Sequence, residues 1–244
     1  MLTSLDTWLA CFERRAANPP ELPDMRELPL LSATERDRIG RSLAIFQLGE
    51  QSGGNTLLAL ARRQAARYRS PAIVRITECF VREEQRHAAT LLEFMQANGI
   101  PRLEKDWTDG VFRILRRLAG FELAISVLVT AELIGLQYYR ALLNSTGSKR
   151  LRAICSLFMQ DEALHVGYES ELLLALRARR TAPVRYAVTL AHAAFHVATA
   201  CVVWMEHRRV LCAAGHTAFG FVHTCANHFA LYFVPAPGRL ARIR

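Results

Sequence analysis

Hydrophobic and polar positions in the first half of the chain recur with the period of α-helices. In residues 32–40, "SATERDRIG", a serine or threonine cap precedes an acid by three positions, and apolar positions continue over 43–66. This pattern predicts a first long helix. Ser70-Pro71 supplies a cap and a first-turn proline for a second helix, whose apolar positions run over 73–95 until Asn98-Gly99 ends it.

The second half of the chain repeats this arrangement. Residues 99–110 are polar and rich in turn-forming residues, and a short basic helix is expected before a long apolar helix that begins with "GFELAISVLV". "NSTGS" ends that helix, and a further long helix is expected over 149–179. Residues 181–244 predict two more apolar helices. The sequence has no strand-like alternation and no glycine-rich nucleotide loop, so NAD, FAD or ATP binding is not indicated.

The predicted fold is therefore all-α, a four-helix bundle with two additional C-terminal helices. We expect three parts along the chain. An N-terminal extension covers 1–33, where four prolines make the chain irregular after a short amphipathic start. The bundle covers 34–180, and the C-terminal apolar helices, expected to pack on it, cover 181–244.

Composition limits the kinds of partner, metal site and cellular compartment that we expect for this protein. With 51% hydrophobic residues the chain is apolar enough to fold around a large core. Its formal charge of +9 comes almost wholly from scattered arginines, since Lys105 and Lys149 are its lysines, and nucleic acid is not expected as a partner. The six cysteines form no C-x-x-C pair, which excludes a four-cysteine metal domain. Reduced thiols in a cytoplasmic protein are expected.

One apolar segment raises the possibility of contact with a membrane. Residues 187–205, "AVTLAHAAFHVATACVVWM", are about long enough to cross a bilayer. The histidines and threonines in this stretch favour a buried core helix instead of a membrane span. Peripheral membrane contact is left open.

Two short motifs place a glutamate and a histidine one helical turn apart. They are "EEQRH", with Glu84 and His87, in the second predicted helix and "DEALH", with Glu162 and His165, in the fourth. Residues at positions i and i+3 lie on one face of a helix. Each pair can therefore present a carboxylate and an imidazole to one metal ion.

The other two long helices each carry a glutamate beside or within an apolar stretch. Glu132 lies in "LAISVLVTAELIGLQYY" and Glu50 in "LAIFQLGEQSGG". An ionised carboxylate facing a core costs several kcal/mol unless it is paired or bound to a metal, although a hydrogen-bonded or rim position is the alternative for either residue alone. Gly49, Gly53 and Gly54 flank Glu50, which predicts either room for O2 or substrate or a kink with close helix packing.

The order Glu, Glu-x-x-His, Glu, Glu-x-x-His resembles the ferritin-like di-iron carboxylate superfamily, which includes rubrerythrins, aldehyde-deformylating oxygenases and quinone-biosynthesis hydroxylases. The resemblance covers about residues 34–180. It implies a ferritin-like bundle in which Glu84 and Glu162 bridge two metal ions, with four terminal ligands: Glu50, His87, Glu132 and His165. Four carboxylates with one nitrogen per metal suit two iron ions, with manganese or a mixed iron–manganese pair as alternatives.

The resemblance also implies a function. A reduced di-iron pair activates O2, so we expect a non-haem di-iron oxygenase or oxidase acting on a small, hydrophobic organic substrate. No electron-donor site is visible in the sequence, so an external donor such as a ferredoxin or reductase is expected, and a homodimer is left open. The alternatives are an iron-handling ferroxidase, a tRNA-modifying di-iron hydroxylase and a metal-free helical interaction module.

The roles of two acids beside the predicted ligands, and of the C-terminal histidines, are left open. Glu83 and Asp161 each precede a predicted ligand glutamate, and either hydrogen-bond the far nitrogen of a ligand histidine or lie on the surface. Glu83 is also an alternative ligand to Glu84. Some related N-oxygenases have an additional histidine ligand. The C-terminal region offers candidates for one, although core or surface roles are the favoured interpretation of each: His192, His196, His207, His216, His223 and His228.

Overall fold

The computed structural model describes residues 3–21, 30–51, 54–106 and 120–234. Every regular element within these ranges is an α-helix, which confirms the all-α prediction. The helices are α1 (Leu5–Ala17), α2 (Ala33–Glu50), α3 (Asn55–Tyr68), α4 (Ala72–Ala97), α6 (Phe121–Ser145), α7 (Lys149–Arg177), α8 (Ala182–Ala213) and α9 (Ala218–Phe233).

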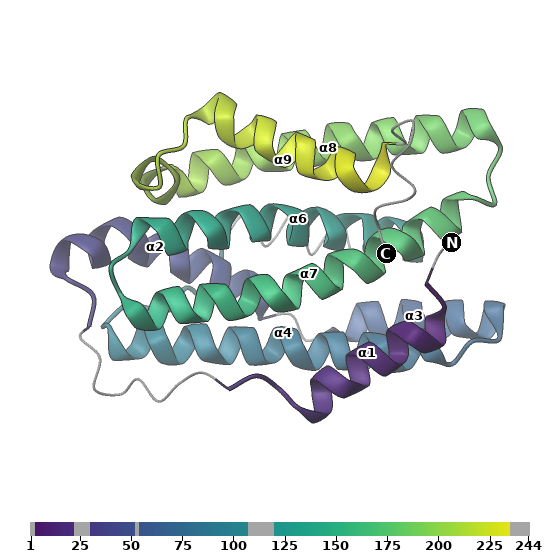
Figure 1. The fold of residues 1–244 in the computed structure, drawn as a ribbon, viewed down its shortest axis with the longest axis horizontal. Coiled ribbons are helices and arrows are strands. Elements are labelled where there is room, and N and C mark those ends of the chain that lie inside the picture. Colours follow the sequence, from purple (N-terminus) through teal and green to yellow (C-terminus); the bar gives the residue numbers. More distant parts are fainter. Residues whose placement is uncertain (1–2, 22–29, 52–53, 107–119, 235–244) are drawn as a thin grey trace.

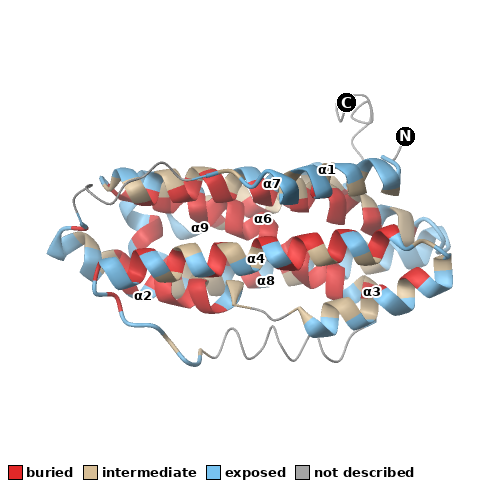
Figure 2. Cartoon of the chain, turned by 90° about the horizontal axis from the view of Figure 1, so that it is seen from below, coloured by how far each residue is buried: buried red, intermediate tan, exposed pale blue. Residues whose placement is uncertain are grey.

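The long helices run side by side along the longest axis of the molecule (Figure 1). α6 packs along α7, while α4 contacts α1, α2, α3 and α7. α8 and α9 form a hairpin that packs on α6, with α8 also touching α2. Figure 2 shows buried positions in red on the inward sides of the helices and exposed positions in blue on the outside.

Local sequence explains where the helices begin. The Ser32 hydroxyl accepts a hydrogen bond from the backbone N–H of Glu35, and the Glu35 carboxylate accepts one from the backbone N–H of Ser32. Together these bonds form a capping box at the start of α2. Ser148 accepts from the N–H of Leu151 at the start of α7, and Thr217 caps α9 in the same manner.

The first long helix, with apolar positions over 43–66, was predicted to be continuous, and that prediction was wrong. α2 ends at Glu50 and α3 begins at Asn55. Gly54 has φ of +65°, and a Cβ placed there would lie 2.5 Å from Cγ2 of Val81 on α4. A residue with a side chain would be strained by the left-handed backbone and would collide with α4. The predicted kink with close packing is thus confirmed at Gly54. The short basic helix expected before residue 120 lies outside the described residues.

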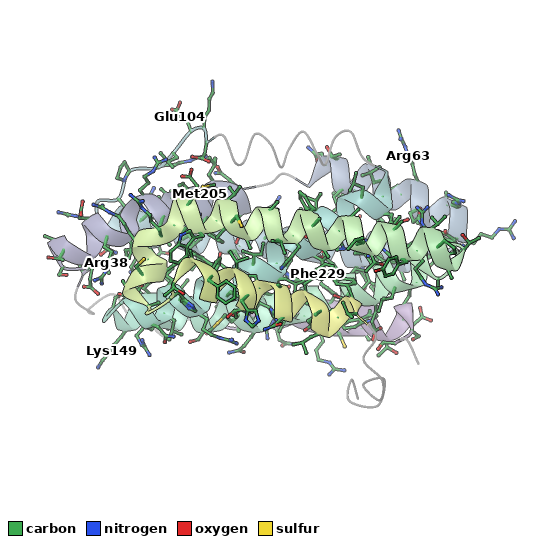
Figure 3. All side chains as sticks on the ribbon, turned by 90° about the horizontal axis from the view of Figure 1, so that it is seen from above. Arg38, Arg63, Glu104, Lys149, Met205 and Phe229 are labelled. Carbon is green, nitrogen blue, oxygen red and sulfur yellow. The ribbon has the colours of Figure 1, made fainter. Side chains whose placement is uncertain are left out.

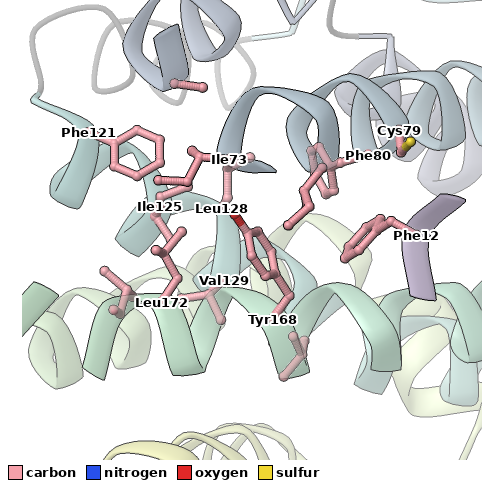
Figure 4. Close-up of a cluster of buried hydrophobic side chains, with 14 of the residues drawn as sticks. Phe12, Ile73, Cys79, Phe80, Phe121, Ile125, Leu128, Val129, Tyr168 and Leu172 are labelled. Atoms are coloured by element: carbon pink, nitrogen blue, oxygen red, sulfur yellow. The ribbon is translucent and has the colours of Figure 1, made fainter. Parts of the chain in front are cut away.

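The N-terminal extension, predicted to be mostly irregular, contains a helix that packs against the bundle. α1 packs against α4 and buries Phe12, which is 1% exposed. The Phe12 ring meets Tyr168 of α7 edge to face at 5.5 Å and stacks on His165 at 5.9 Å. Figure 4 shows Phe12, Phe80 and Tyr168 in the same hydrophobic cluster. α1 is therefore part of the core.

Three apolar clusters fill the core of the described chain; two lie toward opposite ends of the long helices, and the third lies among α6, α8 and α9. Along α4, Phe80 belongs to the first cluster and Leu91 to the second. Along α7, Val166 belongs to the first and Phe158 to the second. The Glu-x-x-His motifs lie between these residues on both helices, so the fold places them in a layer with apolar packing on two sides.

α8 departs from the buried core helix predicted for its central stretch. His192 and His196 are buried as expected. However, only 22% of the most apolar window of α8 is buried, against 83% for the corresponding window of α6. By length and composition alone, both helices could cross a membrane. α6 is a core helix, whereas one long side of α8 faces outward.

Replacing Gly54 with alanine tests the break between α2 and α3. We expect Gly54→Ala to lower the free energy of unfolding by about 3 kcal/mol, because left-handed strain adds to overpacking against Val81. Urea unfolding measures the change. Gly135→Ala is the matched control, since a Cβ there meets nothing within 4 Å, and it should shift stability by less than about 1 kcal/mol. Equal effects at both positions would contradict this account of the break.

Candidate metal centre

The structure brings all six residues predicted as metal ligands into one layer of the core. Their ligand atoms form two groups in which all atoms lie within 4.8 Å of one another. The first group contains Glu50, Glu84, His87 and Glu162, and the second contains Glu84, Glu132, Glu162 and His165. Each of α2, α4, α6 and α7 contributes. Such buried groups could hold metal ions.

Glu84 and Glu162 belong to both groups. The two oxygens of Glu162 face different histidines, with Oε1 at 3.4 Å from Nδ1 of His87 and Oε2 at 3.2 Å from Nδ1 of His165. Oε1 of Glu84 lies 3.6 Å and 3.5 Å from the same two nitrogens. If each group held an ion, both carboxylates would be shared between the two groups, whereas Glu50 and Glu132 each belong to one group.

The four carboxylates oppose one another electrostatically. Burial, followed by the charge of Glu162, raises the pKa of Glu50. Burial and the neighbouring carboxylates also hold the pKa of Glu84 and of Glu132 well above the usual value. The pKa of Glu162 shifts in the opposite direction: burial alone would raise it, but hydrogen bonds from Glu132 and His165 and the contact with His87 lower it. Without metal ions, protons must neutralise this layer.

The two histidines bind some of these protons, because their pKa values are raised. Burial tends to lower the pKa of His87, but its hydrogen bond to Asp161 and the nearby charge of Glu162 raise it to about 9. His165 reaches a pKa of about 10 because contacts with Glu162 and Glu83 outweigh its burial. Divalent cations can replace these protons, because carboxylate oxygens with one imidazole per group are suitable ligands for divalent metal ions.

Two buried atoms in the layer lack hydrogen-bond partners, which supports this fit. They are Oε1 of Glu84 and Nδ1 of His87, both on α4. Buried polar atoms are normally satisfied, and unsatisfied ones call for an explanation. Within the part of the chain that the structure describes, the basic groups in ion pairs with Glu84 and Glu162 are the two histidines.

Glu83 and Asp161 orient the histidines across the helix pair. Nε2 of His87 on α4 donates to Asp161 of α7 at 2.9 Å, and Nε2 of His165 on α7 donates to Glu83 of α4 at 3.0 Å. A proton fixed on each Nε2 leaves Nδ1 free to bind a cation. The expected hydrogen bonds to the far nitrogens are confirmed. Glu83 is directed at His165, so Glu84 and not Glu83 belongs to the two ligand groups.

Two arginines neutralise these outer acids. Arg86 contacts Asp161 at 2.6 Å and Glu83 at 3.0 Å. Arg15 of α1 donates to Asp161 and lies 3.6 Å from Glu83. Hydrogen bonds to His87 and Arg15 help to hold the pKa of Asp161 below its usual value although burial raises it. Sequence reasoning missed Arg15, because nothing in the N-terminal pattern indicates which side of α4 it reaches.

Two further side chains adjoin the layer. The Tyr139 hydroxyl donates to Glu50 at 2.6 Å, which anchors a carboxylate at the last residue of α2. Glu169 is 2% exposed on the next turn after His165, and burial is the main cause that raises its pKa to about 8. Sequence reasoning also missed Glu169, although its i+4 spacing from His165 places both on one helix face.

The C-terminal histidines have other partners. His192 bonds Thr130 and Arg177, and His196 bonds the carbonyl of Cys225. His207, His223 and His228 contact Ser42, Asn227 and Gln137, respectively. Among the described residues, neither ligand group includes any histidine of α8 or α9.

A largely apolar cavity of about 160 Å³ opens directly onto the layer. Glu50, Glu84, Glu132 and Glu162 form one wall. The other walls come from α2, α6 and α8, including Phe46, Ile134 and Val203. Gly49 lines this cavity, and a Cβ there would meet nothing within 4 Å. Open space thus lies at Gly49 and close packing at Gly54, while Gly53 lies outside the described residues.

Comparison with protein-family models, curated proteins and solved structures gives no match for this chain. A proposal about function therefore rests on the geometry of the layer and its cavity.

The protons in the layer predict a pH dependence. Because the histidine and most of the glutamate pKa values are raised in the folded state, that state binds more protons than the unfolded chain. The stability of the metal-free protein should therefore fall as pH increases from about 6.5 to 9. The histidine contribution is complete below about pH 6.5 and is lost through about pH 9. Thermal unfolding of metal-free protein across this window measures the trend, and a rising midpoint would contradict it.

Removing one outer acid tests the orientation of the histidines. Asp161→Asn takes away the charge that holds the proton on Nε2 of His87, so Mn(II) affinity should fall about 10–100-fold. Competition with a chelator measures the affinity. Glu93→Gln makes the same charge change at an exposed position of α4 and should leave the affinity unchanged. Equal losses in both variants would assign the effect to net charge alone.

Proposed function

We propose that this protein is a non-haem di-iron oxidoreductase that uses O2 to oxidise a small, hydrophobic organic molecule. One observation carries the proposal: two buried ligand groups share Glu84 and Glu162 and open onto a largely apolar cavity. A structural ion would need no such opening. An iron-storage role would need no organic cavity.

The arrangement of helices supports a ferritin-like di-iron bundle. α2 and α6 each supply one glutamate, and α4 and α7 each supply a Glu-x-x-His pair. In the ferritin-like carboxylate proteins the same donors come from two pairs of helices. The α8–α9 hairpin would then be an addition to the bundle that closes the cavity.

The side chains of this layer have distinct tasks in the proposed reaction. Two ferrous ions held there would supply the electrons and open coordination positions that O2 activation requires. Glu83 and Asp161 keep the Nδ1 atoms of both histidines directed at the centre. Tyr139 holds Glu50 by donating its hydroxyl proton to Oε1 of that carboxylate, with 2.6 Å between the two oxygens. Apolar packing on both sides excludes bulk water from the layer.

The cavity favours a compact apolar substrate. Its walls beyond the carboxylates are mostly aliphatic or aromatic, and its volume of about 160 Å³ admits a short chain or a single ring. His207 lies on this wall, and burial lowers its pKa to about 3, so its ring is neutral at physiological pH. Apart from Glu206 and the four carboxylates of the layer, the lining residues are uncharged, which suits an uncharged molecule. Reducing equivalents would come from a separate donor protein.

Anaerobic loading with Fe(II) followed by O2 tests the proposal. We expect two irons per chain and an optical change after O2 whose decay accelerates with an apolar substrate. Glu132→Ala removes a carboxylate from one ligand group and should leave one iron in a folded protein. Glu93→Ala, at an exposed position on α4, should keep two.

Repeated additions of Fe(II) and O2 distinguish the rival function. An iron-handling protein would oxidise many irons per chain without an organic substrate, whereas the proposed enzyme should stop at two. Unchanged iron content in Glu132→Ala would remove that residue from the site. Absence of bound iron in the native protein would overturn the proposal.

A further inference from the structure

The α8–α9 hairpin is unusually poor in charge. From Ala182 to Val234 the charged residues are Arg185, Glu206, Arg208 and Arg209. The 20 residues from 186 to 205 have no charge at all. Figure 3 views the molecule from the side of α8 and α9, the helices nearest the viewer, with Met205 labelled on α8.

One face of α8 within this stretch is both apolar and exposed. Leu190 is 57% exposed and Met205 60%. Exposed positions recur every three or four residues, which places them along one side of the helix: Leu190, Ala194, Val197, Ala198, Cys201 and Met205. His192 and His196 lie on the opposite, buried side. Nothing in the described chain covers this face, although the helix is apolar enough to span a membrane.

Most charges around this face are positive. Arg185, Arg208 and Arg209 are exposed, at the two ends of the uncharged stretch, and Arg209 is paired with Asp37 of α2 at 3.3 Å. The one acid of α8, Glu206, lies 3.7 Å from Arg41 of α2, and its side chain is 20% exposed. Arg208 is in line with Leu190 on this face, whereas Arg185 is turned toward the side of His196, so a second copy packed with its α8 parallel would bring Arg208 against Arg208. An anionic surface would instead attract both ends of the helix.

We propose that this face of α8 binds an anionic lipid bilayer, with the helix lying in the plane of the membrane surface. Apolar side chains would enter the headgroup region while the arginines contact lipid phosphates. α8 would not cross the bilayer. Its inner side is tied to the protein by hydrogen bonds of His192 to Thr130 and Arg177 and of His196 to Cys225, and lipid could not replace these bonds.

The same helix links this surface to the cavity. Thr199, Val202 and Val203 of α8 line the cavity beside the ligand groups. A helix seated on lipid would bring the cavity wall next to the bilayer, where apolar molecules concentrate. This step rests on the proposed function, and it narrows the substrate to molecules that partition into membranes.

Sedimentation with lipid vesicles tests the surface without using enzyme activity. The native protein should bind vesicles that contain phosphatidylglycerol and phosphatidylcholine, and binding should weaken at high salt. Arg208→Gln should weaken it about fivefold, as expected for about 1 kcal/mol per arginine near a charged bilayer. Leu190→Glu with Val197→Glu should weaken it more than about tenfold.

Matched controls separate this face from net charge. Ala66→Glu with Gln96→Glu adds the same two charges at exposed positions of α3 and α4 and should retain binding within about twofold. Failure of the native protein to bind anionic vesicles, or equal losses in both double variants, would overturn the proposal. So would a dimer in solution that Leu190→Glu with Val197→Glu converts to monomer. Iron content of that variant should stay at two per chain, which keeps this test distinct from that of the metal centre.

Discussion

The crowding of four carboxylates and two imidazoles in one buried layer is the constraint on which the rest of the structure depends. A carboxylate surrounded by protein loses the hydration that stabilises its charge, and several carboxylates together repel one another. The layer in this protein lies between two apolar clusters and is reached by four helices. Such an arrangement is stable only when protons or cations neutralise it, so the fold and the chemistry of the site cannot be considered apart.

Neutralisation is divided between an inner and an outer set of acids. The outer acids, Glu83 and Asp161, are paired with Arg15 and Arg86 from α1 and α4. The inner carboxylates have the histidines as their basic neighbours. The outer ion pairs supply fixed acceptors for the Nε2–H groups, and the inner oxygens keep their capacity for cations. Because each outer acid reaches the histidine of the opposite helix, α4 and α7 are held in register by the same contacts that orient the centre.

α8 joins the site to the surroundings of the protein. Its inner side provides cavity walls and hydrogen-bonded histidines, and its outer side is an uncharged face bordered by arginines. Burial lowers the pKa of His192 and His196 to about 3 and 4, so these side chains are neutral where they pack. A helix so apolar on both sides is unusual in a soluble bundle, where the exposed side is normally charged.

The sequence by itself determined the helical class, the long helices apart from the break in the first, and which six residues share a layer. It did so because i, i+3 spacing is a property of the helix and because an acid in an apolar run needs a partner. The break at Gly54 depended on Val81, a residue 27 positions away that approaches only after α2, α3 and α4 pack. Arg15, the crossed pairing of Glu83 and Asp161, the cavity and the exposed side of α8 were likewise decided by tertiary structure. Each depends on which helix faces which, and the period of a single helix contains no information about its neighbours.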